Sequence, residues 1–152
     1  MNGTIEIELP SVERSIAKVR TRAPGSIGDM MDYHLLKEDR EKGEYELQCK
    51  TFDWMRNVNG TLHGGMCATA VDQALGFVAY SYIPAPGITP TIQLQLNYHR
   101  PLIPGEDVIV RVRVVAVTRT MIGMTFEAVR ASVPEKICIT GTGTSFFKLD
   151  KQ

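Results

Sequence analysis

Hydrophobic and polar residues alternate through the second half of the chain. In residues 91–100 (TIQLQLNYHR) the apolar positions are every second residue, and glutamine or asparagine lies between them. A period of two predicts a β-strand with one buried and one wet face. The same signal predicts strands over residues 44–52, 108–117, 124–132 and 136–150. The connections between the later runs are short, which predicts antiparallel neighbours.

The longest apolar run, residues 66–83, contains a single carboxylate, Asp72. The run approaches the length of a membrane span, but an acid near the centre of a span is costly. A helix inside the fold is therefore the better interpretation. Because this helix is apolar on most of its circumference, it must be covered on several sides. The pattern predicts an α+β fold in which a curved antiparallel sheet wraps around the helix.

Two further helices are predicted near the start of the chain, over residues 12–20 and 27–40. Met30, Met31, Leu35 and Leu36 have helical spacing in the second of them. With 152 residues, the chain fits one domain with a sizeable core. We expect an N-terminal extension over residues 1–25 and a single domain over 26–152.

The composition excludes several classes of protein. Lys plus Arg and Asp plus Glu number 17 each, so no nucleic-acid or membrane-surface partner is indicated. The beginning of the chain lacks the apolar run of a signal peptide, so we expect a cytoplasmic protein. The chain has no dinucleotide or P-loop motif and its histidine spacing does not suit a metal, so no cofactor or metal is expected. Three cysteines without CxxC spacing are read as reduced thiols: Cys49, Cys67 and Cys138.

The start of the long helix has the sequence NGTLHGG, in which Gly64 and Gly65 lack side chains. The first N–H groups of a helix have no partner within the helix and carry partial positive charge. Two glycines let a ligand oxygen approach these donors, which predicts an oxyanion site for a polarised carbonyl. The alternative is that the glycines only relieve crowding in a turn.

Asp72 is the second candidate, because an unpaired buried carboxylate costs several kcal/mol. The alternative is an acid that bonds to a loop or faces a wet subunit boundary. Gly64 and Asp72 are eight residues apart, which is about 12 Å along a helix and about 80° around it. One carbonyl can hardly contact both groups on the same helix. We therefore expect the amide of one chain to meet the carboxylate of another, which creates two equal sites in a two-fold dimer.

A carboxylate and an oxyanion donor, without a serine elbow, are typical of thioester hydrolysis. A thiol is a good leaving group, so a strong acid catalyst is less necessary. The carboxylate either attacks the carbonyl or removes a proton from water, and the residues do not decide between these roles.

Residues 57–76, NVNGTLHGGMCATAVDQALG, resemble the Asn-x-x-Gly-x-x-His-Gly-Gly…Asp signature of PaaI-like hotdog-fold acyl-CoA thioesterases. The similarity runs from about residue 26 to 149 and includes NYHRPLIPGEDV. The resemblance implies an acyl-CoA substrate and homodimers that often pair into homotetramers. It also implies roles for five residues: Asp72 as general base or nucleophile, Gly64 as the polarising amide, Asn57 as a positioner of water or substrate, His63 beside the oxyanion site or as a helix cap, and Thr91 as a partner of the acid.

Arg100 is a candidate for the CoA phosphates, as are Arg111, Arg113 and Arg119, although arginines on the wet face of a strand are usually only solvated. Two other functions stay open at this point. One is a non-catalytic acyl-CoA-binding module. The other is a hotdog hydratase or dehydratase, which uses a histidine and acid pair for proton transfer at carbon.

Overall fold

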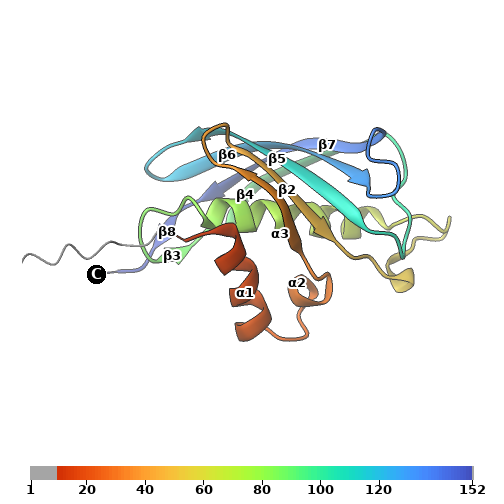
Figure 1. Ribbon diagram of the computed structural model, residues 1–152, viewed down its shortest axis with the longest axis horizontal. Coiled ribbons are helices and arrows are strands. Elements are labelled where there is room, and N and C mark those ends of the chain that lie inside the picture. Colours follow the sequence, from red (N-terminus) through yellow and green to blue (C-terminus); the bar gives the residue numbers. More distant parts are fainter. Residues whose placement is uncertain (1–9, 152) are drawn as a thin grey trace, which may run out of the picture.

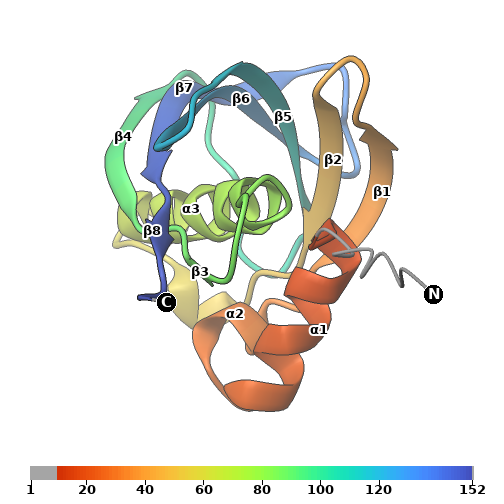
Figure 2. The ribbon, with the colours of Figure 1, turned by 90° about the vertical axis from the view of Figure 1, so that its left-hand side faces the viewer.

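The computed structural model of the chain describes residues 10–151 and shows a strongly curved sheet around a central helix. The helix is α3 (Gly64–Tyr80), and Figure 2 shows the sheet arching over it. Figure 1 shows α1 (Val12–Arg22) and α2 (Ile27–Met30) on the opposite side of α3 from the sheet. The predicted α+β hotdog fold is confirmed.

The main sheet has six antiparallel strands in the order β1-β2-β5-β6-β7-β4. Their bounds are β1 His34–Asp39, β2 Glu44–Cys49, β4 Thr91–Tyr98, β5 Val108–Val117, β6 Met121–Arg130 and β7 Ile137–Phe146. A separate two-stranded sheet pairs β3 (Gly87–Ile88) with β8 (Lys148–Leu149). Strand β3 was not predicted, and β8 is the end of the run predicted as one strand over residues 136–150. A short 3-10 helix covers Asp53–Met55.

The inner face of the sheet and α3 form the hydrophobic core. Ala70, Val71, Ala74 and Val78 of α3 are fully buried, as the apolar run predicts. Gly143 of β7 allows a close approach, because a Cβ there would lie 2.4 Å from Leu75 Cδ1. Among residues 10–151, no helix is long and apolar enough to cross a membrane.

The predicted helix over residues 27–40 is wrong. The helix stops at Met30, Asp32 adopts a positive φ of 47°, and residues 34–39 form strand β1 instead. Pairing of β1 with β2 satisfies the backbone of this segment and overrides its helical spacing. The expectation of neighbouring strands holds for β5, β6 and β7 but not for β4 and β5, because β2 occupies that edge of β5 and β4 pairs with β7.

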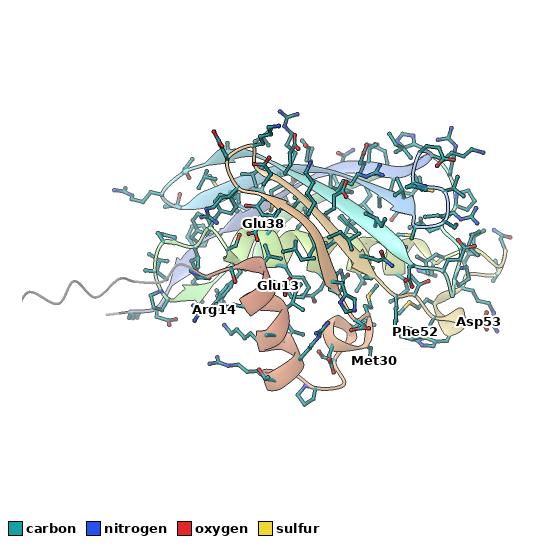
Figure 3. All side chains as sticks on the ribbon, in the orientation of Figure 1. Glu13, Arg14, Met30, Glu38, Phe52 and Asp53 are labelled. Carbon is teal, nitrogen blue, oxygen red and sulfur yellow. The ribbon has the colours of Figure 1, made fainter. Side chains whose placement is uncertain are left out.

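The predicted helix at residues 12–20 is confirmed as α1, which Ser11 caps by accepting a hydrogen bond from the Arg14 N–H. This helix packs against α3 and presents Glu13 and Arg14 to solvent (Figure 3). It therefore contributes to the core, although it lies within the predicted N-terminal extension. Residues 1–9 of that extension lie outside the described residues.

Strand β4 lies at the edge of the main sheet, and it is poorly covered. Ile92 and Tyr98, which the alternation predicts to be buried, are both 55 % exposed, and Leu94 and Leu96 are only half-buried. The predicted apolar face exists, but a single protomer does not bury it.

Candidate active site

The start of α3 leaves one backbone donor free. His63 is the N-cap residue, and its Nδ1 accepts a hydrogen bond of 2.9 Å from the Gly65 N–H. The Gly64 N–H has no acceptor among residues 10–151. Of the two predicted glycines, Gly64 is thus the one whose amide is available to a ligand. His63 thus caps the helix, which is one of the two roles that the resemblance implies for it.

Tyr98, at the end of β4, is a site residue that the sequence reasoning missed. Its hydroxyl donates a hydrogen bond of 2.7 Å to the Gly64 carbonyl and so ties β4 to the first turn of α3. Burial raises the pKa of Tyr98, so the phenol stays protonated as a donor. The signal was present in the alternation of residues 91–100, which places Tyr98 on the face toward α3.

Asn57 orders the turn that leads to α3. Its Oδ1 accepts from the N–H groups of Asn59 and Thr61, and its Nδ2 donates to Thr61 Oγ1 at 2.8 Å. Asn57, Gly64, Tyr98 and Arg100 line one cavity of about 380 Å³. The structure therefore brings three of the predicted site residues together around the free amide.

Asp72 lies in the middle of α3 and is only partly buried. The Thr91 hydroxyl, at the start of β4, donates a hydrogen bond of 2.7 Å to Asp72 Oδ1. The resemblance implies that Thr91 is a partner of the acid, and the fold places its hydroxyl directly on the carboxylate. The acid is not sealed inside its own protomer.

The cavity at Gly64 does not include Asp72 or Thr91. Within one protomer the Gly64 amide and the Asp72 carboxylate are therefore two separate candidate half-sites, and the helix geometry predicts this separation. Strand β4 contacts both of them, because Thr91 at its start bonds to Asp72 and Tyr98 at its end bonds to Gly64. The two half-sites lie at opposite ends of an edge strand.

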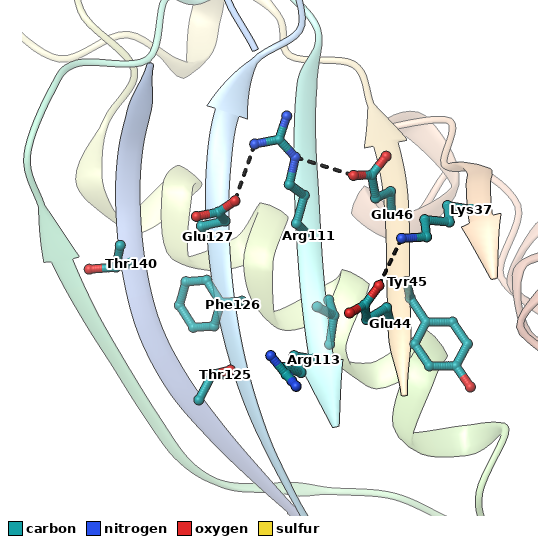
Figure 4. Close-up of a pocket in the computed structure, with 11 residues that line it drawn as sticks. Lys37, Glu44, Tyr45, Glu46, Arg111, Arg113, Thr125, Phe126, Glu127 and Thr140 are labelled. Carbon is teal, nitrogen blue, oxygen red and sulfur yellow. Dashed lines mark hydrogen bonds and ion pairs between the residues drawn. The ribbon is translucent and has the colours of Figure 1, made fainter. Parts of the chain in front are cut away.

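The outer face of the sheet carries a charged hollow of about 360 Å³ (Figure 4). Arg111 forms ion pairs with Glu46 and Glu127 at 3.3 and 3.2 Å, and Lys37 pairs with Glu44. These charges satisfy one another, so Arg111 has a structural partner on each side. The hollow lies across the sheet from α3 and from both half-sites.

The three cysteines lie in the interior, where a thiol is a poor nucleophile. Burial raises the pKa of the Cys67 thiol to about 11, so it is protonated at neutral pH. All three cysteines are free and buried. Within the described part of the chain, no group of three His, Cys, Asp or Glu side chains has the arrangement of a metal site.

The sequence of the chain matches the model of a known family. The sequence model of the thioesterase superfamily matches residues 59–136, just over half of the chain. The matched range includes Gly64, Asp72, Thr91 and Arg100. Among curated protein sequences, none is significantly similar to this chain.

Three solved structures have the same fold. The phenylacetic acid degradation-related protein of Ralstonia eutropha is 21% identical, with a TM-score of 0.74 over 87% of this chain and 98% of its own. Zebrafish thioesterase superfamily member 2 is 23% identical, with a TM-score of 0.71 over 91% and 99%. A Streptococcus mutans protein bound to acetyl CoA is 21% identical, with a TM-score of 0.65 over 80% and 92%. At these identities the likeness establishes the fold.

Proposed function

Since the chain belongs to the thioesterase superfamily, we propose that it is an acyl-CoA thioesterase, which hydrolyses an acyl- or aryl-CoA to the free acid and CoA. The observation that carries the proposal is the pair of half-sites on β4: an amide without an acceptor at one end and a hydrogen-bonded carboxylate at the other. Relatives of this fold that hold CoA or acetyl CoA in their structures support the class of substrate.

The active unit in this proposal is a homodimer, alone or as half of a homotetramer, in which two copies of β4 pair antiparallel. The exposed edge and the half-covered apolar face of β4 support such a partner. An antiparallel two-fold pairing would bring the Thr91 end of one strand beside the Tyr98 end of the other. Asp72 of one protomer then faces the Gly64 amide of its partner.

In the reaction, the thioester oxygen accepts a hydrogen bond from the Gly64 N–H, which stabilises the negative charge that develops on it. Asp72 either removes a proton from the attacking water or attacks the carbonyl itself. In both cases the C–S bond breaks, the CoA thiolate leaves and takes up a proton, and water supplies the new oxygen of the acid. Gly65 and His63 hold the turn, and Arg100 lies where it can bind a phosphate of CoA.

The first test follows release of free thiol from short, long and aromatic acyl-CoAs. We expect Asp72→Ala and Asp72→Asn to lower kcat at least 100-fold, as for loss of a general base. Thiol release that survives both substitutions would reject the role of the acid. Binding of acyl-CoA without turnover by the wild type would instead favour a non-catalytic module.

The Gly64 amide can be tested by a substitution that removes its N–H. Proline is tolerated at the first position of a helix, and the φ of −57° and ψ of 135° at His63 suit a residue that precedes proline. We expect Gly64→Pro to lower kcat about 100- to 1000-fold, the usual cost of losing one oxyanion donor. Gly64→Ala is the matched control, because it keeps the N–H and its Cβ would lie at an ordinary 3.5 Å from the Tyr98 hydroxyl.

Mixing the two inactive variants tests whether each site uses two chains. In a heterodimer of Gly64→Pro and Asp72→Ala, one of the two sites contains an intact amide and an intact carboxylate. Random exchange of protomers should then restore about a quarter of the wild-type activity. A mixture that stays inactive after protomer exchange has been demonstrated would contradict the two-chain site.

A further inference from the structure

A groove of about 310 Å³ lies between α1 and α3, on the side of α3 away from the sheet. Its lining is mainly apolar and includes Val19 of α1 and the C-cap residue Ala23, Gly76 and Phe77 of α3, and Ile88 of β3. The side chains of Lys18 and Arg22 also line it, but no carboxylate does. The groove therefore suits an apolar group, and it holds no negative charge that would repel an anion.

The groove begins beside the candidate catalytic acid. Gln73, the next residue after Asp72, lines the groove, as does Gly76, one helical turn farther along. On the other wall, Thr89 lines the groove two residues before Thr91, whose hydroxyl bonds to Asp72. A substrate carbonyl at Asp72 would therefore have one substituent at the mouth of this groove.

Gly76 is the feature that keeps this end of the groove open. Glycine is, apart from proline, the residue that least favours the interior of a helix. Packing does not require it, because a Cβ on Gly76 would have no atom within 4 Å, whereas a Cβ on Gly143 would clash with Leu75. A side chain at position 76 would project into empty space next to Asp72.

Tyr80 lines the groove one helical turn beyond Gly76. This residue lies eight positions after Asp72, which is about 12 Å along the helix axis. Its hydroxyl accepts a hydrogen bond of 3.1 Å from Lys18 Nζ, and this ammonium also lies 4.5 Å from the centre of the Tyr80 ring. The contact joins α1 to α3 in this part of the groove.

We propose that this groove binds the acyl part of the substrate, with α1 as one wall and Gly76 as the opening through which the acyl group passes. The proposal rests on the thioesterase function, and it names the substrate class as acyl-CoAs with an aromatic or medium-length hydrocarbon group. An apolar cavity of about 150 Å³ holds benzene, so 310 Å³ accommodates an acyl group larger than a single ring. The CoA arm leaves in the other direction, toward the cavity at Gly64 of the partner protomer.

The test compares Gly76→Leu with the wild type on a series of acyl-CoAs from acetyl to decanoyl and on phenylacetyl-CoA. We expect kcat/KM for the longer and aromatic substrates to fall at least tenfold, while the value for acetyl-CoA changes less than threefold. The matched control is Gly123→Leu, which adds the same side chain in open space on the outer face of β6 and should leave the profile unchanged.

A second variant fills the groove from its other wall, so that an effect on the alignment of Asp72 is not mistaken for an effect on the acyl group. The variant is Ala23→Phe, because Ala23 is the exposed C-cap residue of α1 and lines the groove. It should shift the preference toward short acyl groups in the same direction. Equal loss on all substrates for both variants, or an unchanged profile, would overturn the proposal.

Three other outcomes are decisive. If Gly76→Leu changes the oligomeric state in analytical ultracentrifugation and not the acyl preference, the groove is an interface between chains and the proposal is wrong. If the wild type hydrolyses acyl-CoAs but neither groove variant alters the preference, only the acyl site fails. If the wild type releases thiol from no acyl-CoA, the proposed function fails as well.

Discussion

The hydrogen bond between Thr91 and Asp72 makes the role of the acid testable without removing the acid. Thr91→Val deletes the hydroxyl that donates to Asp72 Oδ1 at 2.7 Å and keeps the shape of the side chain. Valine also suits a strand, so β4 should form normally. Within the described residues this is the only side-chain hydrogen bond that Asp72 accepts, so its loss leaves the carboxylate free to rotate.

The size of the effect follows from the type of bond. A hydrogen bond to a charged group contributes about 1.5–3 kcal/mol, which corresponds to roughly a 10- to 150-fold change in rate. Thr91 is exposed in the protomer, so water can replace part of this interaction, and we expect a fall in kcat of about tenfold. KM should change little, because the bond orients the acid and does not contact the bulk of the substrate.

The assay is thiol release under saturating acyl-CoA, together with urea unfolding of each variant. Thr91→Ser, which keeps the hydroxyl, should retain kcat within about threefold of the wild type. The free energy of unfolding should change by no more than about 0.5 kcal/mol, as for other surface positions. Full activity of Thr91→Val, or equal loss in the serine variant, would show that the hydroxyl does not position the acid.

Three further outcomes are expected. Arg100→Ala should raise KM for acyl-CoA about tenfold, which is the cost of losing one charge-assisted contact. KM for the matching acyl-pantetheine, which lacks the nucleotide phosphates, should stay unchanged. A rise in KM for both substrates would reject a phosphate contact. Gly76→Ala should stabilise the protein by about 0.5–1 kcal/mol in urea unfolding, because alanine favours the helix and its Cβ meets no neighbour; a loss of stability would show a hidden packing constraint. Hydrogen bonds of 2.8 Å from Arg130 to both oxygens lower the pKa of Glu106. This pair therefore stabilises the fold above the pKa of the unfolded carboxyl, and the stabilisation is lost as the pH falls through the pKa of the folded carboxyl. Glu106→Gln should lower the urea midpoint at pH 7 and much less at pH 3. A difference in midpoint between variant and wild type that does not narrow in acid would contradict the assignment.

The sequence was sufficient for the elements whose periodicity continues over many residues. The apolar run that became α3 and the alternating runs that became β4 to β7 are long, and burial on one face dictates their pattern. The failure over residues 27–40 has the opposite cause. Two apolar pairs at helical spacing are a weak signal, and the backbone turn at Asp32 and the pairing of β1 with β2 decide the structure there.

The candidate site was predictable in its chemistry but not in its contacts. Glycine and aspartate are unusual residues in an apolar helix, so the sequence alone singled out Gly64 and Asp72 as candidates. Thr91 and Tyr98 are ordinary residues for a strand, and their contacts depend on how β4 crosses α3. Thr91 was therefore named as a partner of the acid only through the family resemblance, and Tyr98 was missed. The groove beside α1 was equally hidden, because it depends on the packing of segments that are distant in the sequence.

The cap at the start of α3 also determines which nitrogen of His63 carries a proton. Because Nδ1 accepts the Gly65 N–H, the neutral imidazole must be the Nε2–H tautomer. In that form Nε2 only donates, so the ring has no free lone pair with which to take a proton from a substrate carbon, as a hydratase requires. The lone pair of Nδ1 is committed to the Gly65 amide, so the ring of His63 serves the turn that presents the Gly64 donor.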